Sequence, residues 1–230
     1  MKILGIVPAR GGSQGIPGKN IKLLNGLPLI AYTLQQAAKA TLIDRVIVST
    51  DDENIAECAR SFAADVPFLR PTHLASATSS TLECILHAIE SLEKHGEKYD
   101  KVCLLQPTSP YRPKGVIDEA IRFFTTQENR SLVSIRKVPA HYNPHWTFFV
   151  EQGRLRKSIP GQLITRRQDL PEAYHRDGAI YILDINYMKQ EGKLLSEDLS
   201  GFEIVSPALI NIDGPEDWDI AEKYMHVISR

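Results

Sequence analysis

The sequence predicts an α/β fold in which a doubly wound, mostly parallel sheet carries helices on both faces. Short apolar segments typical of buried strands alternate along the chain with segments of helical apolar spacing. The 230 residues are enough for one α/β domain with a full core. The hydrophobic content of 43% and the charged content of 24% are ordinary for a globular protein.

The expected elements follow one another from the start of the chain. Strands are expected where apolar and β-branched residues cluster, over residues 3–7, 45–50, 101–105 and 131–136. Helices are expected where apolar residues recur at helical spacing, over residues 28–39, 52–62, 81–93 and 113–126. Asp52 can cap the second helix, and Pro113 suits the first turn of the fourth.

Residues 138–176 interrupt this alternation, and we expect them to form an insert within a single domain spanning residues 1–230. Segments 147–150 and 154–156 predict a small hairpin that turns at Gln152-Gly153. The aromatic residues of the insert suit a lid or a subunit contact. After the insert, strands over 178–183 and 208–212 and a closing helix over 215–228 complete the fold.

Composition narrows the range of partners. The net charge of −1 argues against a nucleic-acid or polybasic membrane partner. Cys58, Cys84 and Cys103 show neither a Cys-x-x-Cys pair nor a zinc spacing, which fits a reducing compartment. No run approaches the ~20 apolar residues of a membrane span, so we expect a cytoplasmic protein.

The segment 8–20, which follows the first strand, suits a triphosphate. Its glycines allow backbone N–H groups to approach phosphate oxygens, and Arg10 and Lys19 add two cations. The kinase and ATPase pattern fails, because Ser13 stands where the first Gly belongs and Asn20 replaces the magnesium-binding hydroxyl. A glycine-rich turn with surface cations is the simpler alternative.

Two further polar segments also follow expected strands. Gln106-Pro107-Thr108-Ser109 follows the third strand and Asp213 follows the last. Because open α/β sheets bind ligands at the carboxyl ends of their strands, we expect these segments to meet segment 8–20. Asn211 and Asp213 alternate along a strand and would face one ligand with oxygen atoms, which suits Mg²⁺. Asp213 also reads as the start of the closing helix.

A set of motifs, in order along the chain, resembles one known family. They are Ala-Arg-Gly-Gly-Ser at 9–13, Pro-x-Lys-Asn-Ile at 17–21, Val-Ser-Thr-Asp at 48–51, Leu-Arg-Pro at 69–71, Leu-Leu-Gln-Pro-Thr-Ser-Pro at 104–110, Arg-Arg-Gln-Asp at 166–169 and Gly-Ala-Ile-Tyr at 178–181. Nearly end to end, the chain resembles the acylneuraminate cytidylyltransferases, also called CMP-sialic acid synthetases. The resemblance implies a nucleotide-diphospho-sugar transferase-like, Rossmann-like fold and a homodimer in which the insert reaches the partner.

The resemblance also implies a reaction and its residues. CTP and a nine-carbon 2-keto sugar acid, of sialic, legionaminic or pseudaminic type, would give the CMP-sugar and pyrophosphate with Mg²⁺. Catalysis would involve Lys19, Arg10, Arg167 and Asp213. Nucleotide binding would involve Ala9, Arg10, Gly11, Gly12, Ser13, Lys19, Asn20, Arg70, Ser80 and Gln106. Gln106, Thr108, Ser109, Arg167 and Tyr181 would bind the sugar acid, and Asp213 and Asn211 the metal.

Simpler interpretations of several of these residues stay open. Ser80 suits a helix cap, the pair Arg166-Arg167 suits a solvated surface, and the Gln106 segment suits a rigid turn. Asp51 and Asp52 read as supporting or capping groups and not as metal ligands, and Asp217 and Asp219 as part of the solvated face of the closing helix.

Four positions depart from the family pattern. Gln14 replaces a usual Lys and Asn211 a usual Asp, while His175 and Asp177 stand where Arg and Asn are more common. These changes keep two alternatives open. One is nucleotidyl transfer to an octulosonate or another sugar, and the other is a nucleotide-binding protein that does not catalyse. A kinase is a more distant alternative.

Overall fold

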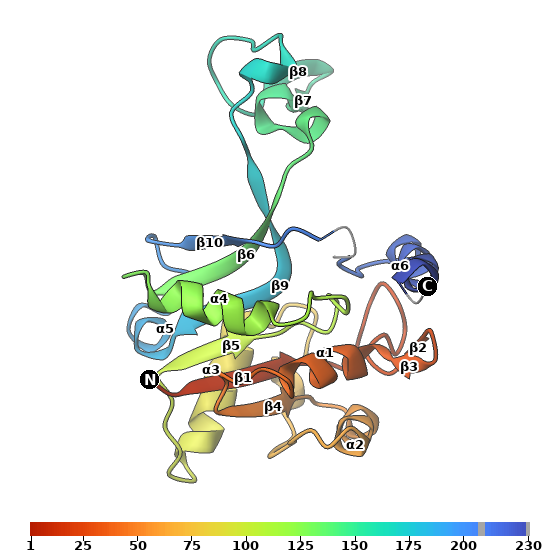
Figure 1. Cartoon of the computed structure of the whole chain (residues 1–230), viewed down its shortest axis with the longest axis vertical. Helices are drawn as coiled ribbons and strands as arrows, with labels where there is room; N and C mark the ends of the chain where they lie inside the picture. Colours follow the sequence, from red (N-terminus) through yellow and green to blue (C-terminus); the bar gives the residue numbers. More distant parts are fainter. Residues whose placement is uncertain (207–209, 229–230) are drawn as a thin grey trace.

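The centre of the computed structural model, which describes residues 1–206 and 210–228, is a six-stranded sheet in the order β10-β6-β9-β5-β1-β4 (Figure 1). Its strands are β1 (Ile3–Pro8), β4 (Arg45–Ser49), β5 (Lys101–Leu104), β6 (Ser131–Lys137), β9 (Tyr174–Asp184) and β10 (Ser200–Glu203). Strand β9 runs antiparallel to both of its neighbours, and the other neighbouring pairs are parallel. The expected α/β class with a mostly parallel sheet is confirmed.

Helices cover both faces of the sheet. One face packs against α1 (Leu29–Ala37), α2 (Glu53–Ser61) and α4 (Val116–Thr125), and the other packs against α3 (Thr81–Glu93) and α5 (Ile185–Glu191). Strand β1 is buried on both sides, because Ile3 and Val7 join the first core and Leu4 and Ile6 join the second. The continuous apolar run of β1 therefore reflects a central strand between two helical layers.

A third apolar cluster fastens the end of the chain to its beginning. Trp218 and Ala221 of α6 (Pro215–Ile228) belong to a cluster with Ile16, Leu24 and Ile212. The short strands β2 (Leu23–Leu24) and β3 (Leu27–Pro28) lie beside α6 (Figure 1). This packing holds the segment before α6 close to the loop that follows β1.

The insert projects away from the rest of the molecule. Strands β6 and β9 lead out of the sheet to β7 (Phe148–Glu151) and β8 (Arg154–Lys157), which lie at the far end of the insert (Figure 1). The expected hairpin is confirmed, with its turn at Gln152 (φ 50°) and Gly153 (φ 76°). In the described part of the chain, four 3₁₀ turns lie at Thr72–Leu74, Ala140–Tyr142, Pro144–Trp146 and Arg167–Asp169.

Several expected boundaries need correction. Helix α4 begins at Val116, so Pro113 precedes it, and the left-handed Gly115 (φ 82°) is the N-cap. Within the expected strand 208–212, residues 210–212 form no strand, and residues 208 and 209 lie outside the described residues. The bounds of α3 and α6 and the cap at Asp52 are as expected. No helix in the described ranges is long and apolar enough to cross a membrane.

Candidate functional site

A cavity of about 470 Å³ lies beside the carboxyl ends of β1 and β5. This is the position at which open α/β sheets bind ligands, and the volume suits a small molecule. The expected site residues that line it are Arg10, Ser13, Lys19, Asn20, Arg70, Ser80, Gln106, Thr108 and Asp213. The three polar segments that are distant in the sequence therefore do meet at one edge of the sheet.

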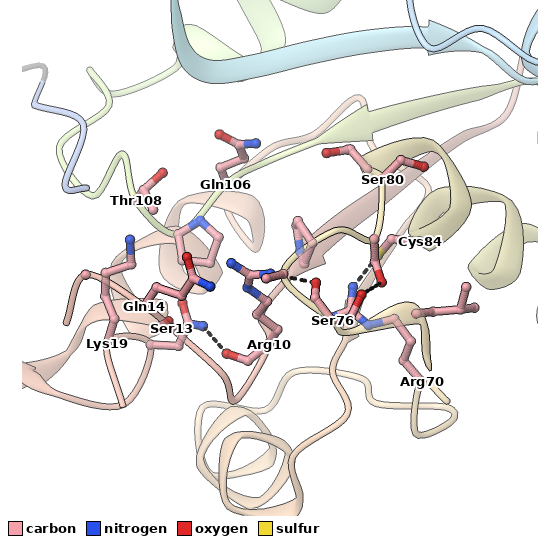
Figure 2. Close-up of a pocket in the computed structure, with 18 of the residues that line it drawn as sticks. Arg10, Ser13, Gln14, Lys19, Arg70, Ser76, Ser80, Cys84, Gln106 and Thr108 are labelled. Atoms are coloured by element: carbon pink, nitrogen blue, oxygen red, sulfur yellow. Dashed lines mark hydrogen bonds between the residues drawn. The ribbon is translucent and has the colours of Figure 1, made fainter. Parts of the chain in front are cut away.

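Arg10 and Lys19 bring two cations to the cavity. Figure 2 shows Arg10 between Lys19 and Arg70 in this view, and the Arg10 guanidinium donates to the Ser76 carbonyl oxygen at 2.7 Å. The Lys19 ammonium donates to the Ile212 carbonyl oxygen at 2.9 Å. Burial lowers the pKa of Lys19, and Asp213 opposes part of this shift. A bound polyanion would favour the charged form of Lys19.

The loop after β1 is shaped by its own backbone contacts. The Asn20 side-chain amide donates to the Arg10 carbonyl oxygen at 3.0 Å, and the Gly11 N–H donates to Asp51 Oδ1 at 3.1 Å. A Cβ at Gly11 would lie 2.6 Å from Asp52 Oδ2, so any larger residue there would force the Asp52 side chain to move. Asn20 and Gly11 thus shape the loop. Ala9, Gly11 and Gly12 lie outside the lining of the cavity.

Arg70 and Ser80 line the opposite part of the cavity, and both are anchored. The Arg70 side chain is buried, and its guanidinium contacts Cys84 Sγ at 2.6 Å and Asp51 Oδ1 at 3.7 Å. The Ser80 hydroxyl accepts from the Glu83 N–H at 3.2 Å, and the Glu83 carboxylate accepts from the Ser80 N–H at 2.8 Å. Ser80 is therefore the N-cap of α3 in a capping box, as its simpler interpretation expects.

The segment around Asp213 is held against the loop after β1. The Ile212 N–H donates to the Thr108 carbonyl oxygen at 2.8 Å, and Ile212 is fully buried. A Cβ at Gly15 would lie only 2.3 Å from the Asp213 carbonyl oxygen. The Asp217 carboxylate accepts from the Asp213 and Gly214 N–H groups at 2.9 and 2.8 Å. The expectation of a merely solvated Asp217 is therefore wrong, because this residue orders the turn that presents Asp213.

A second cavity of about 450 Å³ adjoins the first, and Gln106 and Asp213 line both. Its other lining residues are Arg136, His175, Arg176, Asp177, Gly178, Tyr181 and Asn211. The Asn211 side-chain amide donates to Asp213 Oδ2 at 2.6 Å, which places these two side chains together as expected. Tyr181 is buried, which raises its pKa. The arrangement provides room for two ligands that meet at Gln106 and Asp213.

Arg112, which sequence reasoning missed, holds the loop that carries Gln106. Its buried guanidinium donates to the carbonyl oxygens of Gln106 at 2.6 Å, Ser109 at 2.7 Å and Ala179 at 2.9 Å. A fourth bond reaches Thr33 Oγ1 at 2.9 Å. Burial lowers the pKa of Arg112 to about 10. This side chain joins the loop after β5 to the strand that lines the second cavity.

Besides Ala9, Gly11 and Gly12, two further expected site residues lie outside both adjoining cavities. Arg167 lines a separate cavity of about 440 Å³ at the base of the insert, beside Pro139 and Leu170. Ser109 is fully buried and lines neither of the two adjoining cavities. Within one chain, therefore, the structure does not bring Arg167 to Lys19 and Asp213. Arg176 is the exposed arginine that lines the second cavity.

Comparisons with known proteins identify the family to which this chain is similar. Residues 4–193 match the family described as Cytidylyltransferase. The chain is 35% identical over 236 residues to the CMP-N,N'-diacetyllegionaminic acid synthase of Legionella pneumophila, covering 99% of this chain and 97% of the relative. It is 32% identical over 223 residues to the pseudaminic acid cytidylyltransferase of Campylobacter jejuni, covering 96% and 95%.

Solved structures support the same fold. The CMP:2-keto-3-deoxy-manno-octonic acid synthetase complexed with CTP superimposes with a TM-score of 0.77, covering 99% of this chain and 100% of that chain. The sequence identity to that protein is 16%, so the likeness concerns the fold alone. Together, the match over most of the chain and the full-length relatives show that this chain belongs to the cytidylyltransferase family.

Proposed function

We propose that this protein transfers CMP from CTP to a nine-carbon 2-keto sugar acid and releases pyrophosphate. The observation that carries the proposal is the pair of adjoining cavities that share Gln106 and Asp213. One cavity has the cations that a triphosphate needs, and the other has arginine and hydrogen-bonding groups that suit a sugar acid. The names of the legionaminic and pseudaminic acid relatives agree with this substrate class.

The reaction joins the contents of the two cavities. The anomeric hydroxyl oxygen of the sugar acid attacks the α-phosphorus of CTP, and a new P–O bond forms. The bond from the α-phosphorus to the bridging oxygen breaks, and pyrophosphate leaves with its electron pair. The hydroxyl proton passes to Asp213 or to a water molecule. Positioning and charge neutralisation supply most of the acceleration in such a transfer.

The nucleotide occupies the first cavity in this proposal. Arg10 and Lys19 line this cavity and neutralise the phosphates. Arg70 and Ser80 line the far end and serve the base. Gln106 lies at the boundary between the cavities, where its amide can donate and accept hydrogen bonds with either ligand.

Mg²⁺ fits the residues at the boundary, and we assign it to Asp213 and Asn211. Asn211 Oδ1 is buried and has no hydrogen-bond partner among the described residues. The Asn211 amide nitrogen donates to Asp213 Oδ2 at 2.6 Å, so rotation of this amide would turn Oδ1 toward the same carboxylate. Two oxygen donors are sufficient for a metal ion that keeps several waters and phosphate oxygens as ligands. When bound, Mg²⁺ would neutralise phosphate charge and help to orient CTP.

The sugar acid carboxylate requires a cation in the second cavity. Arg176 lines that cavity and can bind a carboxylate through two parallel hydrogen bonds. We assign this role to Arg176 within one chain. Arg167 can act on the sugar acid only if the insert of one chain reaches the second cavity of another.

A homodimer built on the insert is the assembly that we propose. The exposed apolar side chains of the projecting hairpin support it, with Phe149 52%, Val150 73% and Leu155 68% exposed. An isolated two-stranded hairpin is marginal in water and needs packing against other surfaces. We also propose that the protein acts in the cytoplasm.

The experiment that tests this function measures pyrophosphate release with CTP, Mg²⁺ and a panel of sugar acids. The panel contains N-acetylneuraminate, N,N'-diacetyllegionaminate, pseudaminate and an eight-carbon octulosonate, and UTP replaces CTP as a control. We expect release with CTP and at least one nine-carbon acid. Pyrophosphate release only with the octulosonate would show that the substrate is an eight-carbon acid and not a nine-carbon acid. CTP binding without pyrophosphate release would indicate a protein that does not catalyse.

A further inference from the structure

A buried carboxylate oxygen in the second cavity lacks a hydrogen-bond partner. Asp177 is only 6% exposed and lines this cavity. Its Oδ1 accepts hydrogen bonds from the Ser134 hydroxyl and, at 2.9 Å, from the Ala179 N–H. Its Oδ2 is buried and receives no hydrogen bond from any residue that the structure describes. A buried charged oxygen without a donor is unfavourable, so such an atom indicates a missing partner.

The surroundings of Asp177 contain further acceptors. Asn211 Oδ1 is also buried and without a partner in the described ranges. A Cβ at Gly178 would lie 3.1 Å from Gln106 Oε1 and 3.6 Å from Asn211 Oδ1, so both oxygens converge on the backbone next to Asp177. Gly178 has a φ of 80°, which favours glycine and keeps this space open. This wall of the cavity therefore accepts hydrogen bonds, whereas Arg176 provides donors.

We propose that Asp177 Oδ2 accepts a hydrogen bond from a hydroxyl or N–H group of the bound sugar acid, which makes Asp177 a specificity-determining residue. This inference rests on the proposed transfer of CMP to a sugar acid. An ionised carboxylate accepts hydrogen bonds and cannot donate one. Asp177 therefore favours sugar acids that present a donor at this position and disfavours sugar acids that present another acceptor.

Asp177→Asn is the informative substitution because it changes one atom's chemistry and little else. Ser134 and Ala179 both donate, so the amide oxygen is expected to occupy the place of Oδ1. The amide nitrogen then stands in place of Oδ2 and donates instead of accepting. We expect KM for the preferred sugar acid to rise about 10-fold or more, with kcat and KM for CTP changed less than about threefold.

Asp118→Asn provides a matched control. Asp118 is also a buried carboxylate, and it accepts from the Thr41 and Leu42 N–H groups at 3.0 and 3.1 Å, but it lines neither of the two adjoining cavities. This variant is expected to unfold at a lower temperature and to keep the KM for the sugar acid. If both variants raised that KM equally, the effect would come from general loosening of the fold, and the inference would be wrong.

The comparison uses pyrophosphate release with N-acetylneuraminate, N,N'-diacetyllegionaminate and pseudaminate as substrates. We expect Asp177→Asn to change the ratio of kcat/KM between at least two of these acids by about 10-fold or more. If the wild-type protein turns over an acid and Asp177→Asn shows the same KM and the same ratios, only the inference about Asp177 is overturned. If the wild-type protein releases no pyrophosphate with any acid, the proposed function fails first, and this inference fails with it.

Discussion

Gly15→Ala tests whether the loop after β1 is packed directly against Asp213. A Cβ at Gly15 would lie 2.3 Å from the Asp213 carbonyl oxygen, and a contact under 3.0 Å forces atoms to move. The obstructing atom belongs to the backbone, and Ile212 beside it is fully buried, so a small adjustment cannot relieve the contact. Overpacking of this kind costs about 1–3 kcal/mol of unfolding free energy. For a chain of this length, that loss lowers Tm by about 2–12 °C.

A displacement of the Asp213 backbone by the Gly15→Ala side chain would also disturb the site. Lys19 is bonded to the neighbouring Ile212 carbonyl oxygen at 2.9 Å, so a displaced Asp213 segment changes the position of the Lys19 ammonium as well. We therefore expect Gly15→Ala to reduce kcat for pyrophosphate release in addition to lowering Tm. Thermal unfolding followed by circular dichroism and initial-rate kinetics on the same preparation measure the two effects.

Gly12→Ala is the control for stability in this experiment. A Cβ at Gly12 meets no atom within 4 Å, and the residue has no positive φ, so alanine fits there without strain. Alanine at such a position raises unfolding free energy by about 0.4–1 kcal/mol, because it restricts the unfolded chain. A Gly15→Ala protein with the Tm and kcat of the wild type would refute the packing of the loop against Asp213.

Three further predictions concern other parts of the structure. Arg112→Lys keeps the charge, but a lysine ammonium cannot reach all four acceptors of the guanidinium. Leaving about two of these acceptors unbonded should lower the unfolding free energy by about 2–6 kcal/mol, measured by urea denaturation. An unchanged denaturation midpoint would contradict the role of the guanidinium. Burial lowers the pKa of Lys19, so this lysine begins to lose its proton at a lower pH than an exposed lysine. The kcat/KM for CTP should therefore fall as the pH rises through this lowered pKa, and Lys19→Arg should move that fall to higher pH. Val150→Asp places a charge on an exposed apolar strand of the insert and should give monomers in sedimentation velocity, whereas an unchanged dimer would exclude this surface from the interface.

Local signals were sufficient to predict many elements. The bounds of α3 and α6 were predicted correctly, because Ser80 caps the first and Gly214-Pro215 marks the start of the second. Helix α5 and strand β10 were missed, since each is short and lacks a strong apolar period. The start of α4 was placed too early because Pro113 suits a first turn, whereas Gly115 provides the actual cap.

The site residues were predictable where a polar motif directly follows an apolar strand in the sequence. Arg10 and Lys19 follow β1 and Gln106 follows β5, and these two strands are neighbours in the sheet. Asp213 reaches the same cavity without a preceding strand, because the Ile212 N–H bonds to the Thr108 carbonyl oxygen. Arg112 was not predictable in this way, since its burial depends on Thr33 and Ala179, which are far away in the sequence. The resemblance alone led to Arg167, and only the three-dimensional placement of the insert shows its separation from the cavity within one chain.

The central claim is that the loop carrying Lys19 and the segment carrying Asp213 form one site for the triphosphate of CTP. The most direct measurement compares pyrophosphate release by the wild type, Lys19→Ala and Asp213→Ala with CTP and N,N'-diacetyllegionaminate across a Mg²⁺ titration. We expect Lys19→Ala to lose about 100-fold or more in kcat, and Asp213→Ala to lose activity or its dependence on Mg²⁺. Wild-type rates in Lys19→Ala, together with an unchanged Mg²⁺ titration in Asp213→Ala, would contradict the claim.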